Sequence, residues 1–312
     1  MAKADGGTTP APSRWARTMA IAVVLVALAT SCGGAAASGG GRPHVVAAED
    51  FWGSIAEQLG GDRVEVSSII TNPNADPHEY EPTTADAREL ATATFVIENG
   101  IGYDPWAQKL LDANPVPSRD VLDLGTLLGV SVGGNPHVWY SPPDVQRVID
   151  AVTVEYKRID PKNASYFDRR RASFETKGLA EYHRLISEIR ARYAGTPVGA
   201  SESIFAYMAP ALGLKLITPD SFLTAISEGA EPSAGDKATI DRQISSHEIK
   251  IYVYNSQNAT PDIQRQIEAA RAAGIPVTTI TETLVPADAT FQSWQVRELQ
   301  GIEAALRRAT GR

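Results

Sequence analysis

Two histidines share a stiff local context that is typical of metal ligands. One ends the tripeptide Asp76-Pro77-His78 and the other ends Asn135-Pro136-His137, and an aromatic residue follows each within two positions. Proline fixes its own φ and biases the preceding residue toward extended conformations, so each imidazole is attached to a restrained loop. Two turn histidines that merely follow proline are the alternative interpretation. The matched pair favours metal binding by imidazole nitrogen.

The remaining three histidines lack this context. His44 precedes the first predicted strand, whereas His183 and His247 lie in or at the end of predicted helices. We interpret all three as surface or helix-end residues. They are not candidates for the metal site.

The first 32 residues have the pattern of an export signal. A basic leader precedes the apolar run 19–29, which suits a signal-peptide core but is too short to span a bilayer. Small residues then lead to Cys32, and this arrangement resembles the lipobox of bacterial lipoproteins, in which the cysteine is lipidated. Ala29 departs from the Leu, Val or Ile usual in that motif. The resemblance predicts a lipid anchor at Cys32 on the outer face of the cell membrane, and a plain secretory signal or a buried cysteine is the alternative.

Residues 33–42 predict a flexible tether, because most of them are Gly, Ala and Ser with nothing large enough to pack. Cys32 is the only cysteine, so disulfides have no part in the fold. Without residues 1–32, 26 basic residues face 36 acidic ones, a formal net charge of −10. This balance argues against binding nucleic acid or an anionic membrane through a basic face.

Short apolar runs alternate with amphipathic stretches in the rest of the chain. This alternation predicts an α/β fold with mostly parallel sheets. Strands are predicted at 45–48, 64–70, 94–98, 121–124, 198–200, 215–217, 249–254 and 277–280. Helices are predicted at 51–59, 84–91, 106–113, 142–159, 235–247, 261–273 and 290–308.

A long helical stretch, 163–193, separates the two halves of this alternation. It contains no proline, and its one glycine is Gly178. One continuous helix of that length would measure about 45 Å, and two helices broken near Gly178 are the alternative. We favour a single connecting helix between an N-terminal lobe, 43–162, and a C-terminal lobe, 194–312.

Several longer motifs occur in a familiar order. They are 74–83 (NADPHEYEPT), 99–104 (NGIGYD), 135–140 (NPHVWY) and 228–233 (EGAEPS). With them, the chain from Val45 to Arg308 resembles the metal-binding lipoproteins of bacterial ABC importers for manganese, zinc or iron, the cluster nine (cluster A-I) solute-binding family. The resemblance implies two lobes joined by one rigid helix, with a single metal in the cleft between them.

The resemblance also implies four ligands, two from each lobe. His78 and His137 match the first two. Glu202 matches the third, which is often histidine in zinc-associated members and glutamate in manganese-associated ones. Glu282 stands where the fourth ligand is usually aspartate, and its extra methylene changes the reach or the number of oxygens offered to the metal.

The residues themselves support both glutamates. Glu202 follows the predicted strand 198–200 and Glu282 follows 277–280, so both lie at carboxyl ends of strands, where open α/β sheets bind ligands. The alternatives are a helix N-terminal carboxylate for Glu202 and a solvated loop charge for Glu282.

The expected function is capture of a divalent transition metal for delivery to an ABC permease and its ATPase, by a monomer with no enzymatic activity. Two carboxylates, and the absence of histidine between His78 and His137, favour Mn²⁺ slightly, whereas imidazole also suits Zn²⁺ and Fe²⁺. A zinc-specific member of the same family is the nearest alternative. A metallohydrolase would keep an open metal position for water, and the H-E-x-x-H motif is absent. A metal-dependent adhesin and a binder of a larger ligand, such as a siderophore or haem, are further alternatives.

Overall fold

The computed structural model describes residues 41–73 and 80–312, and its first sheet has four parallel strands in the order β2-β1-β3-β4. Val45 pairs with Val66 on one side and with Phe95 on the other, which places the apolar strand β1 inside the sheet. Such a strand is buried on both faces and therefore consists of consecutive apolar residues. The strands are β1 (His44–Glu49), β2 (Glu65–Ile70), β3 (Phe95–Glu98) and β4 (Asp120–Asp123).

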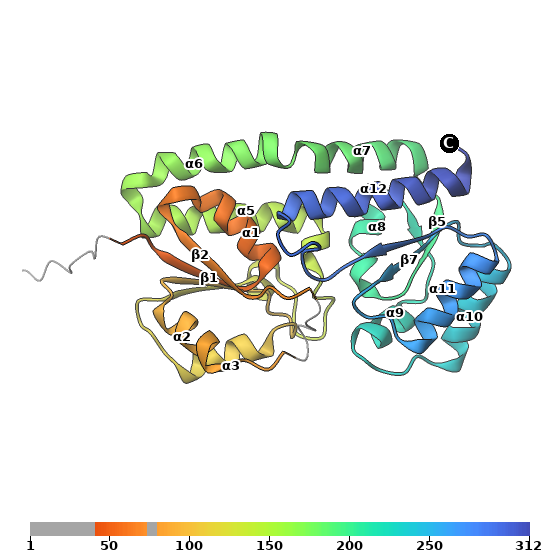
Figure 1. The fold of residues 1–312 in the computed structure, drawn as a ribbon, viewed down its shortest axis with the longest axis horizontal. Coiled ribbons are helices and arrows are strands. Elements are labelled where there is room, and N and C mark those ends of the chain that lie inside the picture. The colour runs from red at the N-terminus through yellow and green to blue at the C-terminus, as the bar shows by residue number, and fades with distance from the viewer. Residues whose placement is uncertain (1–40, 74–79) are drawn as a thin grey trace, which may run out of the picture. The chain divides into compact units, whose positions relative to one another are not determined.

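Helices cover both faces of this sheet. Figure 1 shows α1 and α5 on one face and α2 and α3 on the other. Thr83 and Asp86 form a capping box at the start of α2, which satisfies backbone N–H groups that the helix leaves unpaired. The helices are α1 (Asp50–Gly60), α2 (Thr84–Thr92), α3 (Pro105–Ala113), α4 (Leu124–Leu128) and α5 (Pro142–Ile159).

The second sheet repeats the parallel arrangement with the order β6-β5-β7-β8. Figure 1 shows α10 and α11 on one side of it and α12 on the other. Its strands are β5 (Pro197–Ala200), β6 (Lys215–Leu216), β7 (Tyr252–Asn255) and β8 (Val277–Ile280). Its helices are α8 (Met208–Ala211), α9 (Asp220–Ser227), α10 (Ala234–Ser245), α11 (Pro261–Ala272) and α12 (Phe291–Thr310). The fold is thus α/β with two parallel sheets.

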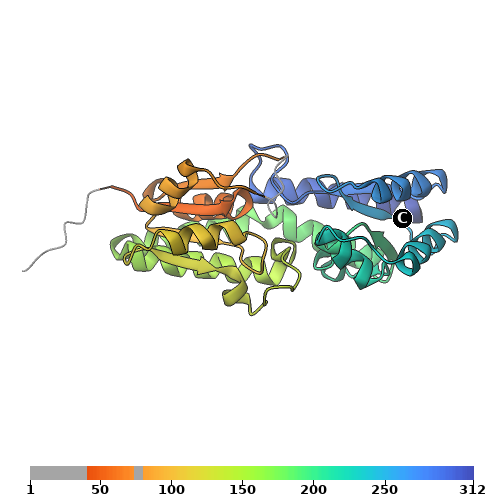
Figure 2. The same cartoon turned by 90° about the horizontal axis from the view of Figure 1, so that it is seen from below.

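The stretch between the sheets contains α6 (Ala164–Ser173), a π-helical turn (Phe174–Gly178) and α7 (Ala180–Tyr193). The Leu179 N–H donates to the Phe174 carbonyl, five residues back, at 2.8 Å. This wider turn lets Phe174 and Leu179 both reach the core, where each is buried. Figures 1 and 2 both show α7 beside α12, with which it packs. Within 41–73 and 80–312, no helix has the length and apolar character needed to cross a bilayer.

The strands and long helices lie within a few residues of their predicted bounds, with two instructive differences. Leu124 begins α4 and does not end a strand, because the Asp123 carboxylate accepts the Thr126 N–H at 2.6 Å and so caps the helix. Helix α9 was not predicted from the sequence. Its eight residues are too few for a clear periodic pattern, and burial of Phe222, Leu223 and Ile226 stabilises it.

Candidate metal site

His137 precedes a short 3-10 turn (Val138–Tyr140) in the first lobe and is 1% exposed. Its Nδ1 lies 2.7 Å from Asn135 Oδ1 and 3.3 Å from Ser203 Oγ. The amide oxygen can only accept, so Nδ1 carries the proton and donates to Asn135. That tautomer leaves the Nε2 lone pair for a metal, which is the usual arrangement of a ligating histidine.

The other histidine of the matched pair, His78, and the cysteine predicted to be lipidated, Cys32, lie outside the described residues. The chain is well anchored on both sides of 74–79. Pro73 O accepts a hydrogen bond from Gln257 Nε2 of the second lobe. Tyr80 donates to Asp86 at 3.0 Å.

Glu202 lies two residues after the end of β5, in extended backbone, and is 1% exposed. Its Oε2 accepts a hydrogen bond from Asn258 Nδ2 at 2.9 Å. Its position at the carboxyl end of a parallel strand agrees with the sequence-based expectation. The next residue, Ser203, contacts the His137 ring, so this strand end faces the first lobe.

Glu282 follows β8 and is 6% exposed. Its Oε1 accepts from Asn255 Nδ2 at 2.6 Å, and its Oε2 accepts from the Tyr103 hydroxyl of the first lobe at 3.0 Å. Its backbone N–H donates to Gln257 Oε1 at 2.5 Å. Two side-chain donors from opposite lobes therefore orient the carboxylate.

Hydrogen bonds fix the loop that carries Tyr103, the residue whose hydroxyl reaches Glu282 in the second lobe. The Asp104 carboxylate accepts the backbone N–H groups of Asn99 and Gly100 at 2.7 and 2.8 Å. Burial raises the pKa of Asp104 to about 6, although these two donors oppose the shift. Asn99 Nδ2 donates to Pro136 O at 3.0 Å, so the same loop also supports the backbone beside His137.

Contacts bring the three described candidates toward one another. Tyr103 packs edge-on against the His137 ring, with centroids 6.2 Å apart, and donates to Glu282. Ser203, adjacent to Glu202, contacts the same ring. Within the described ranges, no three His, Cys, Asp or Glu side chains form a group that could hold a metal. The four-ligand hypothesis therefore depends on His78.

A small cavity lies beside the residues that contact His137. Its volume is about 200 Å³, and both lobes contribute to its walls. Asn135 and Ser203, which contact His137, are among the lining residues. The rest are Ile101, Gly102, Val132, Gly133, Gly134, Pro136, Thr224, Ser227 and Glu228.

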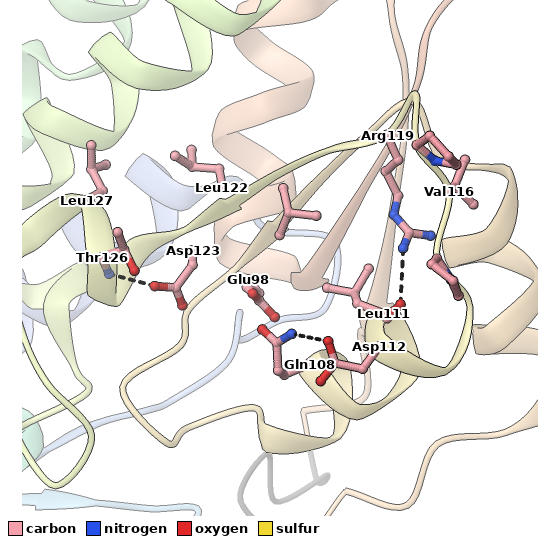
Figure 3. A pocket seen from close by; sticks show the side chains of 13 residues that line it. Glu98, Gln108, Leu111, Asp112, Val116, Arg119, Leu122, Asp123, Thr126 and Leu127 are labelled. Atoms are coloured by element: carbon pink, nitrogen blue, oxygen red, sulfur yellow. Dashed lines mark hydrogen bonds between the residues drawn. The ribbon is translucent and has the colours of Figure 1, made fainter.

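A larger cavity lies elsewhere, in the first lobe between α3 and the edge strand β4 (Figure 3). It is an open crevice of about 730 Å³. Glu98 lines it and is 2% exposed, and burial together with Asp104, Asp123 and Asp112 raises the pKa of Glu98 to about 8. Of the described ligand candidates, His137, Glu202 and Glu282, none lines this crevice, so its size does not bear on their role in metal binding.

The histidines assigned to the surface lie apart from these residues. His44 begins β1 and lies 3.2 Å from Glu89, and His183 is exposed on α7. His247 is exposed and lies 2.8 Å from Ala273 O.

Sequence reasoning missed the polar residues that hold the predicted ligands. Tyr103 and Asn135 lie inside motifs that the resemblance singled out, but no role was assigned to them. Asn255 ends strand β7, and Gln257 and Asn258 continue this polar run in the following loop. Their place at the carboxyl end of a parallel strand was a usable signal, of the kind that identified Glu202 and Glu282.

Comparisons with known proteins agree with this architecture. Residues 45–305 match the family described as Zinc-uptake complex component A periplasmic (ZnuA). The chain is 25% identical over 262 residues to the manganese ABC transporter substrate-binding lipoprotein PsaA of Streptococcus pneumoniae, covering 77% of this chain and 81% of that protein. It is 23% identical over 264 residues to the high-affinity zinc uptake system protein ZnuA of Bacillus subtilis, again covering 77% and 81%.

A solved structure shares the fold. The Cd-bound periplasmic metal binding protein of Candidatus Liberibacter asiaticus aligns with a TM-score of 0.71 at 19% identity, covering 85% of this chain and 100% of that one. The family match spans nearly all of the described residues. The chain therefore belongs to the ZnuA family of periplasmic zinc-uptake complex components, whose relatives include substrate-binding lipoproteins of metal ABC transporters.

Proposed function

We propose that this protein captures one divalent transition metal between its lobes and delivers it to an ABC permease. The observation that carries the proposal is the pairing of a buried imidazole, His137, with buried carboxylates from the opposite lobe, Glu202 and Glu282. His78 is the proposed fourth ligand. Two neutral imidazoles and two carboxylates neutralise a dication, which removes much of the cost of taking its charge from water.

The proposed substrate is Mn²⁺ slightly ahead of Zn²⁺, with Fe²⁺ also compatible. Two carboxylate oxygens favour a harder ion, whereas imidazole suits zinc and iron equally well. Relatives named for manganese and for zinc are similar to this chain to nearly the same degree. Most such sites bind Zn²⁺ more tightly than Mn²⁺ whatever their biological substrate, so affinity alone does not assign the metal.

We further propose that Cys32 carries a lipid anchor that keeps the protein on the outer face of the cell membrane. The tether at 33–42 then gives the folded lobes freedom to reach the permease, which works with its ATPase. The protein acts as a monomer. Its role is binding without catalysis, because four protein ligands leave no position for an activated water.

Metal analysis of the protein purified from its native envelope, followed by titration with Mn²⁺, Zn²⁺ and Fe²⁺, tests this function. The expected result is one tightly bound ion per chain. The double variant His78→Ala/His137→Ala should lose that ion, and His183→Ala, which removes an exposed histidine of α7, should retain it. Unchanged stoichiometry in the double variant would overturn the site.

A further inference from the structure

The end of β7 and the loop that follows it supply amide groups to both proposed carboxylate ligands. Asn258 Nδ2 donates to Glu202 Oε2 at 2.9 Å, and Asn255 Nδ2 donates to Glu282 Oε1 at 2.6 Å. Only two residues therefore separate the two amides that orient Glu202 and Glu282. We call Asn255–Asn258 the amide loop.

The third amide of the loop, Gln257, contacts the backbone around Glu282 and the first lobe. Its Oε1 accepts the N–H groups of Glu282 and Thr283 at 2.5 and 3.2 Å. Its Nε2 donates to Thr283 Oγ1 at 2.6 Å and to Pro73 O. Pro73 lies five residues before His78, so one side chain contacts the backbone of the Glu282 segment and the segment that leads to His78.

The amide loop is itself fixed, so it can impose its geometry on the carboxylates. The Asn255 N–H donates to Ser201 Oγ at 3.0 Å, and Asn255 Oδ1 accepts the Gln257 N–H at 2.9 Å. Asn258 Nδ2 also donates to Ile226 O at 3.3 Å. Asn255 is fully buried. A donor held in this way restricts rotation of the carboxylate that it contacts.

We propose that the amide loop determines metal preference by setting how many carboxylate oxygens reach the ion. This inference rests on the proposed metal-binding function. Asn258 engages one oxygen of Glu202, and Asn255 engages one oxygen of Glu282, whose other oxygen accepts from Tyr103. These bonds restrain each carboxylate from turning both oxygens onto the metal. Restrained carboxylates give a low coordination number, which Zn²⁺ accepts, whereas Mn²⁺ favours six oxygen-rich positions. Asn255 and Asn258 are thus positioning residues. Their hydrogen bonds favour Zn²⁺ and reduce the preference of the site for Mn²⁺.

The test uses Asn258→Leu and Asn255→Leu, which keep approximate side-chain size and remove the donor. Asn114→Leu is the matched control, because its amide donates only to Leu110 O in the first lobe. Competition titrations give the dissociation constants for Mn²⁺ and Zn²⁺. Both test variants should bind one ion, lose about 10–100-fold in Zn²⁺ affinity and lose less in Mn²⁺ affinity. The ratio of affinities should move toward Mn²⁺ by roughly tenfold, whereas the control should match the wild type.

A spectroscopic measurement separates positioning from general damage. Electron paramagnetic resonance of the Mn²⁺-loaded Asn258→Leu protein should show an altered zero-field splitting, as expected for added oxygen coordination. If Asn255→Leu does not fold, Asn255→Ala, which also removes the donor but adds no bulk, takes its place. An unchanged spectrum and affinity ratio at full stoichiometry would overturn the inference and leave metal capture intact. Failure of the wild type to bind metal would overturn the proposed function instead.

Discussion

The hydroxyl of Tyr103 in the first lobe donates a 3.0 Å hydrogen bond to Glu282 Oε2 in the second. Tyr103 is completely buried, so this bond lies in a low-dielectric environment where a charged acceptor strengthens it. The bond orients a proposed ligand from across the cleft. It also couples the position of the Tyr103 loop to the segment that carries Glu282.

Removing this donor should weaken metal binding. Tyr103→Phe leaves the ring in place against His137 and deletes only the hydroxyl. A hydrogen bond to a charged group contributes about 1.5–3 kcal/mol, so we expect a roughly tenfold or greater rise in the dissociation constant, measured by calorimetry. Tyr166→Phe, whose hydroxyl accepts the Asp62 N–H far from the site, is the control. Equal affinity in both variants would contradict a positioning role for Tyr103.

Shortening the fourth proposed ligand should also weaken binding. Glu282→Asp restores the aspartate usual in the family but withdraws the carboxylate from Tyr103 and Asn255, which contact it in this chain. We expect about a tenfold loss of affinity. If Glu282→Asp binds metal more tightly than the wild type, the hydrogen bonds from Tyr103 and Asn255 do not place Glu282 for metal binding.

The protonation of His137 should depend on Asn135. Asn135→Leu removes the acceptor of the Nδ1 proton, so the neutral ring becomes a mixture of tautomers and offers Nε2 less often. Nitrogen-15 NMR of the histidine ring should show this change in metal-free protein. Metal affinity should fall about 10–100-fold. Asn135→Asp keeps the acceptor and should preserve the tautomer of His137. If the tautomer is lost in Asn135→Asp, residue 135 does not set the protonation of His137.

Buried Glu298 should make stability depend on pH. It accepts the Tyr140 hydroxyl at 2.6 Å and the Thr281 N–H at 2.9 Å, yet burial raises its pKa from 4.5 to about 8. Between these values the folded chain holds a proton that the unfolded chain releases. This contribution to stability is therefore fully present below about pH 4.5 and is lost as pH rises toward 8, with a limiting slope of about 1.4 kcal/mol per pH unit.

Denaturant unfolding of the metal-free protein at several pH values measures that slope. Glu298→Gln keeps a neutral hydrogen-bonding side chain at every pH and should flatten the dependence between pH 5 and 8. Glu268→Gln, on the exposed face of α11, should leave it unchanged. An equal pH dependence in the wild type and in Glu298→Gln would show that Glu298 is ionised in the fold.

The π-helical turn should reject a substitution that helix propensity favours. Alanine is about 1 kcal/mol better than glycine in a helix interior, but a Cβ at Gly178 would lie 2.9 Å from the ring of buried Phe174. We therefore expect Gly178→Ala to lower the free energy of unfolding by about 1–2 kcal/mol. Gly235→Ala in α10 meets only Ser233 Oγ at 3.8 Å and should be neutral or stabilising. Thermal or urea unfolding distinguishes the two.

Much of the architecture could be predicted from the sequence because its causes are local. Consecutive apolar residues such as Val45–Ala48 indicate buried parallel strands, and proline at the start of 142–159 marks a helix beginning. Predicted bounds therefore agree closely with β8 and α5. The same local patterns indicated that Glu202 and Glu282 follow the carboxyl ends of strands.

Tertiary structure decided what surrounds those residues. No local pattern links Tyr103 to Glu282, 179 positions later, because that contact depends on how the two lobes pack. The bond from Asn258 to Glu202 likewise arises only when β5 and β7 become neighbours in the sheet. Sequence alone therefore predicted which side chains serve as ligands and which strand ends present Glu202 and Glu282. Only the packing of distant segments decided which hydrogen bonds orient these side chains. The energy of a hydrogen bond depends on the distance between its two atoms and not on their spacing along the chain.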